Sequence, residues 1–263
     1  MNKYYFTICY FQLIFAFVIF GVPVEEDIND LRIKYGNKAT HPYSFLASLN
    51  VDGSLCGGSL IEPQWVLTAA HCLRKLKKNA RVTAHFNSTS IFGGKSRVVE
   101  KIIPHPKYNS AKDLTHYDIG LLKLAYPVDE TIAKPIQLAS GDENTSYGGI
   151  DAMIIGWGAT ELGSITASLR EAPVHTIDND QCTWKAISNH QICANIPDKS
   201  PTTCTGDSGG PVVRQNDHGK WEQIGIVSYS QSGFGDRKCN TYNMYTKVSA
   251  YGKWIQDTIN ENL

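Results

Sequence analysis

Residues 206–211 read Gly206-Asp207-Ser208-Gly209-Gly210-Pro211, and this short stretch decides between folds. Its glycines accept backbone conformations that other residues avoid, and their small size lets a ligand approach the peptide N–H groups closely. Ser208 is therefore a candidate nucleophile, although an ordinary turn would explain the segment taken alone. The rest of the chain decides whether a base and an acid accompany it.

Two other segments supply a base and an acid. His71 follows the apolar run Trp65–Leu67, so its imidazole is expected at the end of a strand. Asp118 opens the apolar run Ile119–Leu124, which reads as a buried strand, and a buried carboxylate needs a partner. A core or surface histidine and a strand-capping aspartate are the plain alternatives for each residue alone. Together with Ser208 they form a possible nucleophile, base and orienting acid.

The order of these residues along the chain separates two folds. Gly206-x-Ser208-x-Gly210 also fits the nucleophile elbow of the α/β-hydrolases, which place the serine before the acid and the histidine. His218 is the only histidine that follows Ser208, and no parallel βαβ pattern precedes the serine. The order His71, Asp118, Ser208 is that of the chymotrypsin type.

The pattern outward from these segments is that of an all-β protein. The composition, with 13 Tyr, 5 Trp, 22 Gly and 11 Pro, favours strands and turns over a helical bundle. Short apolar or alternating runs broken by turn residues predict strands at Tyr43–Asn50, Ser59–Ile61, Trp65–Ala69, Val98–Ile103, Ile119–Leu124, Asp151–Gly156, Gly210–Val213, Gln223–Val227 and Asn243–Val248. Tyr251, Trp254, Ile255 and Ile259 share one face of a predicted C-terminal helix.

Six segments in this order resemble the trypsin/chymotrypsin family of serine proteases, over about residues 33 to 260. They are Cys56–Ile61, Trp65–Cys72, Asp118–Leu124, Gly156–Gly158, Gly206–Pro211 and Tyr245–Val248. The resemblance implies two antiparallel six-stranded β-barrels with an active site in the cleft between them, followed by a C-terminal α-helix. It also implies a serine endopeptidase acting on protein or peptide substrates, with no cofactor.

The resemblance assigns a role to each candidate site residue. Ser208 is expected to attack the scissile carbonyl, His71 to carry its proton, and Asp118 to orient the imidazole. The backbone N–H groups of Gly206 and Ser208 are expected to form the oxyanion hole. The substrate pocket is expected at Thr202, Ser228, Ser230 and Asn243. Because none of these carries a negative charge, we expect a preference for uncharged residues, chymotrypsin-like or elastase-like.

Seven cysteines are present, and Cys9 lies in the N-terminal apolar stretch. The remaining six form an even set, which indicates disulfides in a secreted chain but allows 15 pairings. The resemblance selects Cys56–Cys72, Cys182–Cys193 and Cys204–Cys239. No C-x-x-C pair is present, and Val82–Arg97 contains no acid, so we expect no metal site.

The N-terminus predicts a secreted zymogen. Lys3 and the apolar stretch Thr7–Phe20, too short for the roughly 20 residues of a spanning helix, indicate a signal peptide at residues 1–21. An uncleaved membrane anchor is the alternative. Residues 22–32 then form an activation propeptide before a catalytic domain at residues 33–263. Cleavage after Arg32 by an arginine-specific protease would free Ile33, whose ammonium pairs with Asp207 in the family; Lys34-Tyr35-Gly36 departs from the family's usual Val-Gly-Gly.

The chain's charge excludes some partners. Its 25 Lys and Arg balance 25 Asp and Glu, so nothing points to nucleic acid. Asn87 and Asn144 begin glycosylation sequons, which fits an extracellular protein. We expect a monomer with no membrane partner that meets protein protease inhibitors. A catalytically weak or inactive homologue that acts as a binding or cofactor protein is the alternative function.

Overall fold

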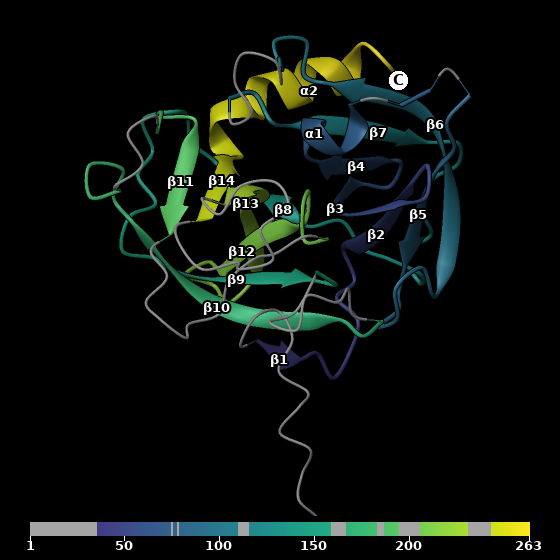
Figure 1. The fold of residues 1–263 in the computed structure, drawn as a ribbon, viewed down its shortest axis with the longest axis horizontal. Coiled ribbons are helices and arrows are strands. Elements are labelled where there is room, and N and C mark those ends of the chain that lie inside the picture. The colour runs from purple at the N-terminus through teal and green to yellow at the C-terminus, as the bar shows by residue number, and fades with distance from the viewer. Residues whose placement is uncertain are drawn as a thin grey trace, which may run out of the picture.

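The computed structural model describes residues 36–74, 76–77, 79–109, 116–158, 167–182, 187–194, 206–230 and 243–263. Two closed antiparallel barrels of six strands each make up the body, confirming the predicted fold class (Figure 1). Helix α2 lies at the end of the chain. No helix among these residues is both long and apolar enough to cross a membrane.

The first barrel has the strand order β2-β3-β4-β7-β6-β5. Its strands are β2 (Leu46–Val51), β3 (Ser54–Glu62), β4 (Trp65–Thr68), β5 (Val82–Phe86), β6 (Lys95–Pro104) and β7 (Gly120–Leu124), and the short helix α1 (Ala70–Leu73) follows β4. Leu49, Leu67, Phe86 and Leu121 are fully buried in its core. Burial of such side chains is the main favourable term in its folding.

The second barrel closes in the order β9-β10-β11-β14-β13-β12. Its strands are β9 (Asp151–Gly156), β10 (Arg170–Ile177), β11 (Gln191–Ala194), β12 (Pro211–Gln215), β13 (Trp221–Ser230) and β14 (Asn243–Lys247). Two short strands flank it: β1 (Asn37–Lys38) pairs with β10, and β8 (Gln137–Leu138) pairs in parallel with β13. Ile154, Ile224 and Tyr245 lie in its core.

The C-terminal segment crosses from the second barrel to the first. The 3-10 turn η1 (Ser249–Tyr251) leads into α2 (Gly252–Asn260), whose Ile255 and Ile259 are buried in the same core cluster as the first barrel. Lys123 of β7 donates to the backbone carbonyl of Asn262 at 2.5 Å. The helix therefore ties the end of the chain to the first barrel (Figure 1).

The barrels meet through backbone at the serine segment. Gly57 N–H of β3 donates to the Ser208 carbonyl at 2.8 Å. An added Cβ on Gly57 would lie 2.6 Å from the Cα of Gly210, closer than such atoms approach. Only glycine fits at position 57, because the backbone of Gly210 occupies the space that a Cβ would need.

Gly57→Ala is expected to destabilise the protein by about 1–3 kcal/mol, because the new methyl group has to push one barrel away from the other. Gly252→Ala is the matched control, because an added Cβ there meets open space at the start of α2. It is expected to be neutral or slightly stabilising. Urea unfolding with intact disulfides measures both; equal unfolding midpoints would contradict the proposed crowding at Gly57.

Candidate active site

Asp118 and His71 form a buried pair in the first barrel. The Asp118 side chain is completely buried, just before β7, and its Oδ2 lies 2.7 Å from His71 Nδ1. Its other oxygen, Oδ1, accepts the backbone N–H of His71 at 2.8 Å. With Asp118 ionised, the hydrogen of a neutral His71 stays on Nδ1 and the lone pair is on Nε2. The partner that a buried carboxylate needs is therefore present.

The second barrel supplies further donors to Asp118. Ser228 Oγ of β13 donates to Asp118 Oδ2 at 2.6 Å, and Thr246 Oγ1 of β14 donates to the Asp118 carbonyl at 2.8 Å. The Ser228 bond is charge-assisted and helps to offset the cost of burying the carboxylate, whereas the Thr246 bond positions the backbone of Asp118. Sequence reasoning named Ser228 as a pocket residue and assigned no role to Thr246, although the motif Tyr245–Val248 was recognised.

The residue before Asp118 has an unusual backbone. Tyr117 has a φ of +58°, a backbone conformation that residues other than glycine rarely adopt. Its N–H donates to the hydroxyl of Tyr251 at 3.2 Å, and its ring stacks on His105 at 4.9 Å between centroids. These contacts hold the conformation that precedes Asp118, and no pattern in the sequence predicts them.

Ser208 and His71 line the same cavity. The cavity has a volume of about 350 Å³, and its lining includes Gly206, Ser208, His71 and Cys56. Among the described residues no hydrogen bond joins Ser208 Oγ to His71 Nε2. Catalytic hydrogen bonds are often long in the absence of substrate and tighten when it binds.

The loop around Ser208 depends on glycine at two positions. Gly206 has φ of +104° and Gly209 has φ of +79°. A Cβ on Gly209 would meet Thr68 Oγ1 at 2.3 Å. Within the described parts of the chain, neither the Gly206 N–H nor the Ser208 N–H donates to a carbonyl.

Asp207 lies between two glycines of the second barrel. Gly158 N–H donates to its Oδ1 at 2.8 Å, and an added Cβ on Gly156 or Gly158 would lie within about 2.3 Å of its carboxylate oxygens. This close approach explains why Gly156-Trp157-Gly158 needs its glycines. Arg32 and Ile33, the expected activation residues, lie outside the described residues.

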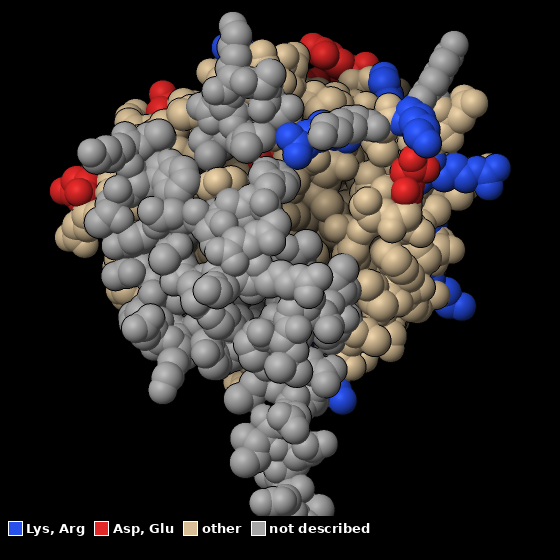
Figure 2. Space-filling view, in the orientation of Figure 1, with Lys and Arg blue, Asp and Glu red and all other residues tan. Residues whose placement is uncertain are grey.

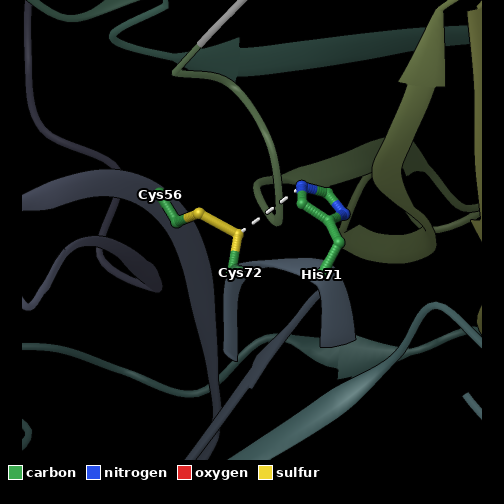
Figure 3. Close-up of side chains that lie close together, drawn as sticks. All are labelled: Cys56, His71 and Cys72. Atoms are coloured by element: carbon green, nitrogen blue, oxygen red, sulfur yellow. Dashed lines mark hydrogen bonds between the residues drawn. A yellow bond between two sulfur atoms is a disulfide. The ribbon is translucent and has the colours of Figure 1, made fainter. Parts of the chain in front are cut away.

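Two of the three expected disulfides are present, Cys56–Cys72 and Cys182–Cys193. Cys204 and Cys239 lie outside the described residues. Cys56, His71 and Cys72 bring potential metal ligands within 4.8 Å of one another (Figure 3). Both sulfurs are joined to each other, with His71 Nε2 3.7 Å from Cys72 Sγ, so this group offers no thiolate to a metal.

The expected pocket residues are described only in part. Asn243 is fully buried on β14, and its Nδ2 donates to the Tyr245 hydroxyl at 3.4 Å. Burial is the main cause that raises the pKa of Tyr245. Thr202 and the side chain of Ser230 lie outside the described residues.

The fold and these contacts define a chymotrypsin-like class of protein, with two barrels and a buried Asp–His pair beside a serine in a glycine-rich loop. A family model described as Trypsin matches residues 33–255. The chain therefore belongs to the trypsin family of serine endopeptidases.

Two known proteins illustrate the family relationship. Transmembrane protease serine 11G of Mus musculus is 35% identical over 232 residues, which cover 85% of this chain and 54% of that protein. The chain thus spans about half the length of this curated relative. A solved structure of HL collagenase superposes with a TM-score of 0.74 at 28% identity, covering 86% of this chain and 98% of the other.

A buried histidine near the Asp118 segment predicts acid sensitivity. Burial, followed by the charges of Lys107 and His190, lowers the pKa of His105 to about 4. The unfolded chain takes up a proton on this histidine near its ordinary pKa of about 6.5. This contribution to stability is therefore complete above about pH 6.5 and is lost as the pH falls towards 4.

His105→Phe keeps an aromatic ring against Tyr117 but removes the imidazole that binds the proton. The decline of the free energy of unfolding between pH 6.5 and 4.5 is expected to be shallower than in the unaltered protein, by up to about 1.4 kcal/mol per pH unit. Urea unfolding at several pH values measures the slope, with His218→Phe in an exposed turn as the control. Identical slopes for His105→Phe and the unaltered protein would contradict the prediction.

Proposed function

We propose that this chain is a secreted serine endopeptidase that cleaves protein substrates through an acyl-enzyme. The observation that carries the proposal is the Asp118–His71 pair beside Ser208 at one cavity. Membership of the trypsin family supports it. Ser208 Oγ attacks the scissile carbonyl, while His71 Nε2 accepts its proton and later passes it to the leaving amine.

The surrounding groups complete the proposed mechanism. Asp118 holds His71 in the required tautomer and stabilises the imidazolium that forms during attack. The N–H groups of Gly206 and Ser208 stabilise the oxyanion; removal of one such donor typically costs about 10²–10³ in rate. Ser228 lies near the C-terminal end of β13, and a substrate backbone pairs with this part of the strand as a further strand.

The proposed maturation consists of export followed by cleavage of the propeptide. Residues 1–21 act as a signal peptide, and an arginine-specific protease removes residues 22–32. The new Ile33 ammonium then pairs with Asp207 and orders the oxyanion hole. The disulfides fit an oxidising, extracellular compartment, and the exposed Asn87 and Asn144 are accessible for glycosylation. Protein inhibitors of serine proteases are the proposed regulators of the active monomer.

A catalytically inactive binding protein is the competing function, and loss of the proposed nucleophile separates the two. In material whose N-terminal sequence begins at Ile33, Ser208→Ala is expected to lower peptide hydrolysis by about 10⁶-fold and to abolish organophosphate labelling. His71→Ala is expected to behave similarly, because the residues act as a unit.

Ser96→Ala changes an exposed serine on β6 and is the matched control, expected to retain full activity. A Ser208→Ala protein that hydrolyses peptides at close to the unaltered rate would exclude Ser208 as the nucleophile. An unaltered protein that begins at Ile33 and cleaves nothing would favour the binding function.

The preferred residue before the cut bond follows from the proposed pocket residues. Thr202, Ser230 and Asn243 carry no negative charge, and polar side chains at the last two narrow the slot. We expect cleavage after Phe, Leu or Ala to exceed cleavage after Arg. Matched peptides that differ only at this position measure the preference through kcat/KM. A clear preference for Arg would mean that an acidic side chain enters the pocket and that the assignment of Thr202 is wrong.

A further inference from the structure

The chain has no net charge, but its charges are strongly segregated. Residues 74–107 contain nine Lys and Arg and one acidic residue, Glu100. This stretch includes β5, β6 and the connection that leaves α1. In the view of Figure 2, Lys and Arg side chains follow the edge of the molecule over the first barrel. A one-sided distribution of this kind produces a local positive field even in a neutral protein.

The basic segment begins at the cavity beside Ser208. Arg74 and Leu76 belong to the lining of this cavity, together with His71 and the Cys56–Cys72 disulfide. The other lining residues come from the β2–β3 hairpin and the serine loop, and no described lining residue belongs to β13. Under the proposed function, β13 holds the part of the substrate before the cut bond. The cavity therefore lies on the side of the leaving group.

Two further cationic residues are neighbours of lining residues. Lys77 is exposed and adjoins the lining residue Leu76. Arg81 is exposed, and its carbonyl accepts the N–H of Asp52, another lining residue, at 3.1 Å. Within the described lining Asp52 balances Arg74, so the excess positive charge at this end of the site comes from the exposed Lys77 and Arg81 beside it.

We propose that this cavity binds the residues that follow the cut bond and selects substrates with acidic side chains there. The inference rests on the proposed function and adds its substrate class. The half-buried Leu76 and the disulfide supply apolar lining, while the exposed Lys77 and Arg81 beside the lining attract carboxylates. A peptide substrate is the chosen partner, because the positive charge starts within the cavity that holds Ser208.

The experiment uses the activated protein and peptides that are identical except for Glu, Gln or Lys at the second and third positions after the cut bond. At low ionic strength, kcat/KM is expected to be about three- to tenfold higher for Glu than for Lys. The ratio is expected to approach one in 1 M salt, where the Debye length shrinks to about 3 Å. The double substitution Lys77→Glu with Arg81→Glu is expected to invert the preference.

Lys134→Glu with Lys220→Glu is the matched control, because it makes the same change of charge at exposed positions outside the cavity lining. It is expected to keep the Glu preference. A short chromogenic ester without residues after the cut bond reports activity apart from this selection, and the Lys134/Lys220 control is expected to cleave it at the unaltered rate.

The outcomes separate the inference from the proposed function. A protein that cleaves neither ester nor peptide contradicts the proposed function itself. A protein that cleaves both but shows equal kcat/KM for Glu and Lys at low salt overturns the inference. A Glu preference that survives in the Lys77/Arg81 variant also overturns it, because other groups then cause it. Equal rates together with tight binding of a sulfated polysaccharide would assign the basic residues to a polyanion instead.

Discussion

The candidate site depends on a contact between two stretches of backbone. Gly57 of the first barrel meets Ser208 and Gly210 of the second with no side chain between them. Ser59 Oγ adds a buried bond to Gln223 Oε1 at 2.6 Å across the same junction. Packed interiors are hardly compressible, so this contact fixes the distance between the barrels. It does so at the point where Ser208 and His71 act together in the proposed mechanism.

The same junction makes the buried charge of Asp118 tolerable. The carboxylate belongs to the first barrel, but Ser228 and Thr246, which donate to this residue, belong to the second. The first barrel alone lacks the Ser228 donor, and an ionised carboxylate that loses a donor is costly to bury. Correct assembly of the barrels and a correctly oriented His71 are therefore the same structural event. This dependence gives a physical reason for a site built between two units.

The sequence predicts most of this architecture where local pattern and tertiary structure agree. Asp151–Gly156 forms β9 as predicted, because an apolar run between turns leaves little ambiguity. Of the barrel strands, β5, β10 and β11 were not predicted, and β10 shows why. It contains Pro173, and its buried side chains include Arg170, which is 1% exposed and donates to the Gly36 carbonyl. A charged residue in a core position has no signature in a hydrophobic pattern, because its partner is 134 residues away. The contacts of Thr246 with Asp118 and of Tyr251 with Tyr117 were not predicted for the same reason, since these residues meet only after folding.

The position of Asp207 links the proposed activation to the geometry of the site. Its carboxylate accepts the Gly158 N–H, and its backbone carbonyl accepts the Gly210 N–H at 2.9 Å. Asp207 is therefore held both through its side chain and through its backbone. Its chain neighbours Gly206 and Ser208 carry the proposed oxyanion donors. If the carboxylate turns towards a new ammonium, the peptide units on either side have to move with it. Gly206, with φ of +104°, has no Cβ to oppose such a movement. This glycine is thus suited both to the proposed oxyanion hole and to the proposed activation step.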